Sequence, residues 1–122
     1  DASFLLTKNL IPLLKESSSS SIIFTSSGVG RKGRAYWGAY SISKFATEAM
    51  MQILFDELQN TTSIRVNCIN PGAVRTKMRE SAYPAENPEN NPSAVEIMNP
   101  YLYLMSDLSK DISGQSIDAQ AH

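Results

Sequence analysis

Apolar residues recur at helical spacing in two long segments of the chain. The pattern over residues 2–15 ends at a run of serines, residues 17–21, and predicts a helix followed by a loop. A second pattern, over residues 40–60, predicts the longest helix of the chain. Its broad apolar face holds Ile42, Phe45, Ala46, Ala49, Met50, Ile53 and Leu54, and Met51, Phe55 and Leu58 widen it. A helix this apolar is expected to touch more than one neighbour.

Short runs of β-branched and aromatic residues predict buried strands. Residues 21–25 form one run, which ends in a glycine-bearing turn, and residues 64–69 form another, which Pro71-Gly72 stops. Residues 112–119 offer a last short strand. Residues 93–105 predict a further helix, with Pro92 at its start and a kink at Pro100.

The alternation of strand and helix favours an α/β fold, with helices packed on the faces of a parallel sheet. In such sheets ligands bind beyond the carboxyl ends of the strands. Ser26-Ser27 and Asn70-Pro71-Gly72 both follow predicted strands, so they should meet at one rim. Residues 80–92 are polar and proline-rich. They are either a plain surface loop or a mobile lid over that rim.

Composition limits the possible functions. The chain has 122 residues, enough for one domain or part of one, and a net charge of -1. Because no basic patch is present, a nucleic acid is not expected as a partner. No apolar run is long enough to span a membrane, and residues 1–20 lack the pattern of a signal peptide. We therefore expect a cytoplasmic protein without a membrane-bound segment.

Two residue types that often carry chemistry are each present once. Cys68 falls within a predicted strand, which favours a buried structural thiol over a nucleophile, and a lone cysteine forms no internal disulfide or cysteine metal site. His122 is the last residue, where a chain end or an expression remnant is more plausible than a base. No metal site is predicted.

Tyr40 and Lys44 are the candidate proton-transfer pair. They lie four residues apart on a predicted helix, so their side chains share one face. A fixed cation beside a phenol favours the phenolate, and such a tyrosine can give or take a proton at a carbonyl or hydroxyl oxygen. The spacing alone is more typical of an ordinary surface pair than of a catalytic one. Ser27, at the end of a predicted strand, is the natural residue to hold that oxygen.

Further motifs surround this pair in a fixed order. Ser27 lies thirteen residues before Tyr40, Asn70-Pro71-Gly72 and Thr76 follow the next strand, and a closing segment covers residues 113–119. Together with the Tyr-Ser-Ile-Ser-Lys run at residues 40–44, they make the sequence resemble the short-chain dehydrogenase/reductase family over essentially all of residues 1–120.

The resemblance implies a fold and a reaction. Residues 1–122 would be the C-terminal half of a single Rossmann-like, doubly wound parallel sheet whose first strands are absent from this chain. The activity would be hydride transfer between NAD or NADP and a small carbonyl or alcohol substrate. Tyr40 would be the acid/base, Lys44 would also hydrogen-bond the nicotinamide ribose, and Ser27 would hold the substrate oxygen, while Ser26 faces away.

Further contacts follow from the same resemblance. The turn at Pro71 and Gly72 would cover the nicotinamide, with the Val74 backbone on the carboxamide and the Thr76 hydroxyl nearby. Tyr40 and Lys44 also count among the cofactor-binding residues. Residues 77–92 would be the variable substrate-binding lid, and the protein would form a homo-dimer or homo-tetramer.

The sequence also departs from the family pattern. It has no glycine-rich strand-to-helix phosphate loop, because the G-x-G-x-x-G match at residues 28–33 does not lead into a helix. The family's catalytic asparagine should fall before residue 1, and Asn9 is displaced from that place by about two turns. We therefore expect a fragment that is inactive alone. The residues that choose between NAD and NADP belong to the missing part.

Two rival functions were weighed. A serine acyl-transferase is suggested by the S-x-x-K run at residues 41–44, but neither S-D-N nor K-T-G occurs in the sequence. A non-catalytic oligomerising module, built on the two apolar helices, is compatible with the enzyme hypothesis. The lid does not reveal the substrate. Tyr36 and Tyr83 are each as plausible on the surface or in the core as in a pocket, so neither is assigned to the site.

Overall fold

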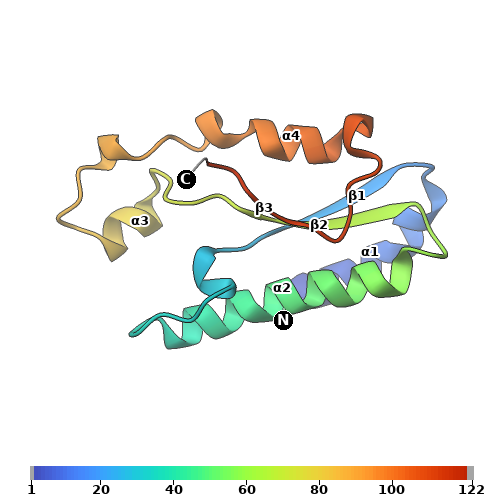
Figure 1. Cartoon of the computed structure of the whole chain (residues 1–122), viewed down its shortest axis with the longest axis horizontal. Helices are drawn as coiled ribbons and strands as arrows, with labels where there is room; N and C mark the ends of the chain where they lie inside the picture. The colour runs from blue at the N-terminus through green and yellow to red at the C-terminus, as the bar shows by residue number, and fades with distance from the viewer. Residues whose placement is uncertain (1, 121–122) are drawn as a thin grey trace.

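The computed structural model describes residues 2–120, and the prediction made for His122 lies outside them (Figure 1). Three parallel strands form one sheet in the order β1-β2-β3. The strands are β1 (Ser20–Thr25), β2 (Ile64–Asn70) and β3 (Ser116–Asp118). The predicted α/β class with a parallel sheet is confirmed. The carboxyl ends of all three strands lie at one edge, as the sequence predicted for β1 and β2.

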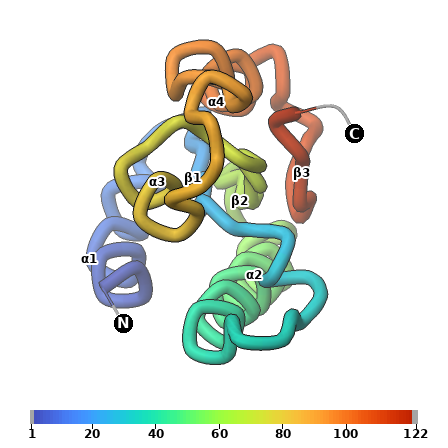
Figure 2. The backbone as a smooth tube through the Cα atoms, turned by 90° about the vertical axis from the view of Figure 1, so that its left-hand side faces the viewer, coloured from blue at the N-terminus to red at the C-terminus, as the bar shows by residue number. Residues whose placement is uncertain are grey.

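Helices cover both faces of the sheet. The long helices α1 (Ala2–Glu16) and α2 (Gly38–Leu58) lie on one face and α4 (Asn99–Met105) on the other (Figures 1 and 2). The short helix α3 (Lys77–Ala82) lies between β2 and α4 in the chain. Four 3-10 turns complete the structure, at Gly28–Gly30, Pro88–Asn90, Val95–Ile97 and Asp107–Ser109. Within residues 2–120 no helix is both long and apolar enough to cross a membrane.

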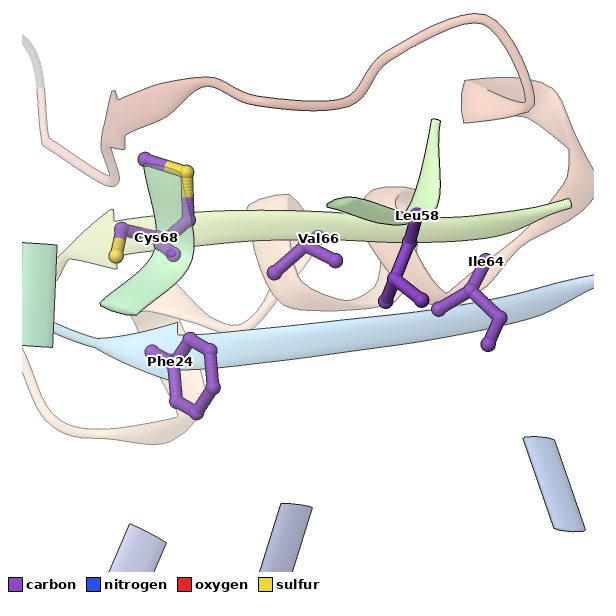
Figure 3. Packing of buried hydrophobic residues seen from close by; sticks show 6 residues of the cluster. Phe24, Leu58, Ile64, Val66 and Cys68 are labelled. Carbon is purple, nitrogen blue, oxygen red and sulfur yellow. The ribbon is translucent and has the colours of Figure 1, made fainter. Parts of the chain in front are cut away.

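The core lies between the sheet and α2. Strand β2 is central and buried from Ile64 to Ile69, because it pairs on both edges and is covered on both faces. Its alternate residues Ile64, Val66 and Cys68 pack with Phe24 of β1 and Leu58 of α2 (Figure 3). Each large apolar side chain buried in this way stabilises the fold by about 1.5–3 kcal/mol.

The other face of β2 carries polar side chains toward the segment around α4. Arg65 donates to the Ser19 hydroxyl at 3.0 Å and to the Leu104 carbonyl at 3.4 Å. Asn67 donates to the Ile112 carbonyl at 3.1 Å and accepts from the Gln115 amide at 3.0 Å. These bonds fix the C-terminal segment on the sheet, since buried polar groups are stable only when paired.

Two helix predictions need correction. The helix predicted over residues 93–105 is split into the 3-10 turn Val95–Ile97 and α4, which begins at Asn99. Pro100 therefore lies in the first turn of α4 and not at a kink, because a proline there has no intrahelical hydrogen bond to lose.

The apolar face predicted for α2 is largely exposed. Ile42 is 72% exposed and Ile53 57%, whereas Ser41, Glu48, Met51 and Leu58 are buried. The sheet side of this helix is polar in its first half because it faces the polar strand ends. Its apolar stripe is thus free for a second partner within the described structure.

Glu48 is a buried carboxylate at the junction of α2 with two strands. It is 6% exposed, and its Oε1 accepts from the Ser26 hydroxyl at 2.6 Å and the Ser116 hydroxyl at 2.7 Å. Arg31 Nε lies 3.5 Å from the same oxygen, and Arg31 also binds Asp118 at 2.6 Å. A single carboxylate therefore ties α2 to the residue that follows β1 and to the first residue of β3.

Replacing Glu48 by alanine is expected to destabilise the fold by about 2 kcal/mol, because the buried Ser26 hydroxyl, the Ser116 hydroxyl and Arg31 lose their acceptor. Glu48→Gln keeps an acceptor oxygen and should lose less than half of that. Urea unfolding of the protein expressed from its complete gene measures the free energies. Glu57→Ala, an exposed change on the same helix, is the control. Equal stability of Glu48→Ala and the control would contradict this role.

Cys68 is a core residue, as predicted. Its side chain is 0% exposed, and burial, together with the nearby Glu48 carboxylate, raises the pKa of the thiol from 9.0 to about 12. The thiolate is the reactive form of cysteine. In the folded protein the Cys68 thiol is therefore both inaccessible to reagents and protonated.

Alkylation of Cys68 by iodoacetamide at pH 8 should be undetectable over an hour in the native state and complete in urea, because the folded thiol is buried and protonated. Mass spectrometry of the Cys68 peptide locates the label. Rapid labelling of the native protein would show that this strand is open to solvent.

Candidate active site

Tyr40 and Lys44 lie on the first turns of α2, beside the end of β1. The Lys44 ammonium donates to the Thr25 carbonyl, with Nζ 3.1 Å from the oxygen. Its nitrogen lies 5.7 Å from the centroid of the Tyr40 ring. The last carbonyl of the strand thus holds the cation beside the phenol, in the arrangement that the spacing predicted.

The short turn between β1 and α2 fixes the start of that helix. A Cβ on Gly30 would lie 2.8 Å from both the Cβ and the carbonyl oxygen of Lys44, so only glycine permits this close packing. One turn earlier, the Ser41 hydroxyl donates to the Val29 carbonyl at 2.5 Å. The segment Gly28–Gly30 is therefore a support for α2, and no α-helix begins there.

Ser27 follows β1 and lines the same hollow as the pair. Its Oγ accepts from the Val29 amide at 3.4 Å, which caps the 3-10 turn and orients the side chain. The preceding residue, Ser26, is 2% exposed and sends its hydroxyl to Glu48. Because successive side chains of an extended strand alternate, this anchoring of Ser26 turns Ser27 toward the hollow.

The turn after β2 forms the neighbouring wall. Asn70 Oδ1 accepts from the Gly72 amide at 3.1 Å, and Asn70 Nδ2 donates to Asp118 at 3.1 Å. Gly72 has a φ of +74°, and a Cβ there would lie 2.8 Å from Gln120 Nε2. Gln120 donates to the carbonyls of Pro71 and Ala73, each at 2.8 Å. The turn is thus rigid and glycine is required at position 72.

One cavity of about 470 Å³ brings the predicted site residues together. All of them line it, although they come from three separate segments: Ser27, Tyr40, Lys44, Pro71, Gly72, Val74 and Thr76. Thr76 uses its oxygen to accept from the Arg79 amide at 3.1 Å, at the start of α3. Asn9 contributes nothing to this cavity and donates to Leu5 on its own helix.

The segment 77–92 closes one side of the cavity with a defined structure. Arg79 makes two hydrogen bonds of 2.9 Å to Glu86, and Asn91 adds one of 3.0 Å. These bonds hold the pKa of Glu86 at about 2. Arg75 bonds the Pro92 and Pro88 carbonyls at 2.8 Å and 3.2 Å. The role of this segment as a mobile lid over the cavity stays a prediction.

Three residues that the sequence analysis left out also line the cavity: Trp37, Arg79 and Tyr83. Trp37 could have been noticed, because it lies one helical turn before Tyr40. Tyr83 was left unassigned among surface, core and pocket, and Arg79 had no signal of its own, since the approach of both to the cavity depends on the path of residues 77–92. Tyr36 is fully exposed and does not line the cavity.

Comparisons with known proteins identify relatives of this chain. Residues 1–87 match the family model for short chain dehydrogenases. The uncharacterized oxidoreductase YciK of Escherichia coli K12 is 55% identical over 98% of this chain, which covers 47% of that protein.

Two solved structures extend the similarity to the fold. A short chain dehydrogenase from Pseudomonas syringae is 61% identical, with a TM-score of 0.95 over 98% of this chain and 48% of its own. One from Shigella flexneri 2a strain 301, complexed with NADP, is 55% identical, with a TM-score of 0.94 over 98% of this chain and 49% of its own. The chain spans about half the length of these relatives. It belongs to the short-chain dehydrogenase/reductase family.

Proposed function

We propose that this chain supplies the proton-transfer side of an NADP-dependent oxidoreductase that interconverts a carbonyl compound and its alcohol. The observation that carries the proposal is the single cavity where Ser27, Tyr40 and Lys44 meet beside the Pro71-Gly72 turn. A phenol, a fixed ammonium and a second hydroxyl around one space are suited to moving a proton to and from oxygen.

Each residue has a separate task in reduction. The Lys44 ammonium, held by the Thr25 carbonyl, stabilises negative charge on the Tyr40 oxygen and so makes that phenol a ready proton donor. Tyr40 Oη gives its proton to the substrate oxygen while Ser27 Oγ donates a hydrogen bond to the same oxygen. Oxidation of the alcohol reverses these steps, with the Tyr40 phenolate as base.

The cavity fits the nicotinamide end of the cofactor. The rigid turn at Pro71 and Gly72 and the side chain of Val74 offer a flat wall for a ring, while Lys44 and Thr76 offer donors for a ribose and a carboxamide. When bound, NADPH supplies the hydride that reaches the carbonyl carbon. The choice of NADP over NAD is supported by the Shigella flexneri relative, whose structure holds NADP.

The phosphate-binding side is proposed to come from an N-terminal half outside this sequence. In the G-x-G-x-x-G match, Gly30 packs against Lys44, and Gly28–Gly30 form a 3-10 turn and not the N-terminus of an α-helix that could bind a pyrophosphate. The relatives are about twice as long as this chain. Activity is therefore assigned to the complete gene product.

Tyr40→Phe should lower kcat/KM for carbonyl reduction by roughly a thousandfold, because the ring stays and only the proton donor is lost. Reduction of an aldehyde panel, followed by NADPH absorbance, measures the loss. NADPH binding, followed by fluorescence, should change little. Tyr103→Phe, an exposed tyrosine of α4 outside the cavity, is the matched control. Full turnover by Tyr40→Phe would refute the assigned mechanism.

A second candidate function, self-association, is favoured by the exposed stripe of α2. Ile42, Phe45 and Ile53 recur along one side of this helix and are 72%, 44% and 57% exposed. Exposed apolar patches of this kind mark association surfaces. We propose a homo-dimer or homo-tetramer formed through α2, which is compatible with the enzymatic role.

Phe45→Glu is expected to shift the complete protein toward monomer, because a desolvated carboxylate opposes association. Analytical ultracentrifugation at micromolar concentration measures the change. Glu57→Gln, on the same helix, should leave the assembly unchanged. An unaltered sedimentation coefficient for Phe45→Glu would place the interface elsewhere.

A further inference from the structure

The cavity around Tyr40 has an aromatic wall made by two segments of the chain. Trp37 precedes α2 and Tyr83 follows α3, and their rings stack with centroids 6.1 Å apart and an interplanar angle of 29°. The Trp37 ring also lies 5.7 Å from the Tyr40 ring, at 59°. The rings of Trp37 and Tyr83 therefore extend the wall of the cavity beyond the Tyr40 phenol, which is proposed to transfer the proton.

The charge nearest to this wall is already neutralised. The Arg79 guanidinium lies 3.7 Å from the centroid of the Tyr83 ring and makes two hydrogen bonds of 2.9 Å to Glu86. Glu86 remains ionised over the physiological range, since its pKa is about 2. A bidentate pair of this kind leaves Arg79 little attraction for a substrate carboxylate. The pair also holds the Arg79 guanidinium against the Tyr83 ring.

The rest of the wall facing Tyr40 is mainly apolar. It includes Val74, Met78 and Ala82, and the charged residues of the cavity are Arg79 and Lys44. Lys44 is bound to Thr25 and faces Tyr40. Lys32 and Arg34 do not line the Tyr40 cavity. They line an adjoining hollow, which Ser27, Trp37 and Tyr83 also border.

We infer that the substrate is an uncharged carbonyl compound with a flat aromatic body, which packs against Trp37 and Tyr83 while its oxygen reaches Ser27 and Tyr40. This inference rests on the proposed function and deepens it by naming the substrate class. Aromatic contacts favour a flat ring over a saturated one of the same size, and a buried carboxylate without a free partner is rejected.

Three aldehydes of one carbon skeleton test the inference with the complete protein and NADPH. They are 2-naphthaldehyde, its saturated analogue decahydronaphthalene-2-carbaldehyde, and the charged 6-formyl-2-naphthoate. The measured quantity is the ratio of kcat/KM for the flat aldehyde to that for the saturated one. Comparing this ratio between variants cancels the difference in intrinsic reactivity of the two aldehydes.

Trp37→Leu and Tyr83→Leu should each lower that ratio by roughly tenfold, mainly through a higher KM for 2-naphthaldehyde. Tyr103→Leu, outside the cavity, should leave it unchanged. Glu86→Gln, which frees the Arg79 charge, should raise kcat/KM for 6-formyl-2-naphthoate relative to 2-naphthaldehyde several-fold. The wild type should prefer the uncharged naphthaldehyde.

The outcomes separate this inference from the proposed function. If the wild type reduces aldehydes and Tyr40→Phe does not, but both leucine variants keep the wild-type ratio, the aromatic wall does not select the substrate. A wild-type preference for 6-formyl-2-naphthoate would equally overturn the inference. If no aldehyde or ketone is reduced at all, the proposed function fails and the inference fails with it. NADPH binding by each variant shows that it is folded.

Discussion

The Glu48 carboxylate, which accepts hydrogen bonds from the hydroxyls of Ser26 and Ser116, makes the interaction on which the site depends. Glu48 lies one helical turn after Lys44, so it shares a face with that residue. Its bonds to Ser26 and Ser116, at 2.6 Å and 2.7 Å, join α2 to the residue that follows β1 and to the first residue of β3. Because Ser26 is held inward, Ser27 is presented to the cavity. One anchor thus sets the relative position of the serine, the tyrosine and the lysine.

Burying a carboxylate costs free energy, because the charge is removed from water. Several partners of Glu48 offset this cost. Besides the two hydroxyls, Arg31 lies 3.5 Å from Glu48 and continues to Asp118, which accepts from Asn70. Asn70 then orients the Gly72 amide. A chain of polar contacts therefore runs from Ser26, the neighbour of Ser27, to the turn proposed to face the nicotinamide. The position of Ser27 on one side of the substrate carbonyl carbon and the position of the nicotinamide on the other side therefore depend on the same polar network.

Much of the fold could be predicted from the sequence, because the spacing of apolar residues indicates which side of a helix or strand is buried. The three strands and the helices α1 and α2 were expected within a few residues, apart from the longer span given to the last strand. The failures arose where polar residues face inward. Ser41, Lys44 and Glu48 turn toward the sheet, so the apolar stripe of α2, which helical spacing predicted to be the packed face, is the exposed side. Because Ser27 and Pro71 follow neighbouring parallel strands, the sequence was enough to place them at the same edge of the sheet. The stacking of Tyr83 on Trp37 could not be predicted, since it depends on the path by which residues 77–92 fold back over the cavity.

The most direct test of this account is a crystal structure of the complete protein with NADP and a bound alcohol. The account predicts that the alcohol oxygen lies within hydrogen-bonding distance, about 2.6–3.2 Å, of both Tyr40 Oη and Ser27 Oγ, with the nicotinamide ring against the turn from Pro71 to Val74. Glu48 should keep both serine contacts in that complex. An alcohol oxygen bound away from Tyr40, or a nicotinamide placed outside this cavity, would contradict it.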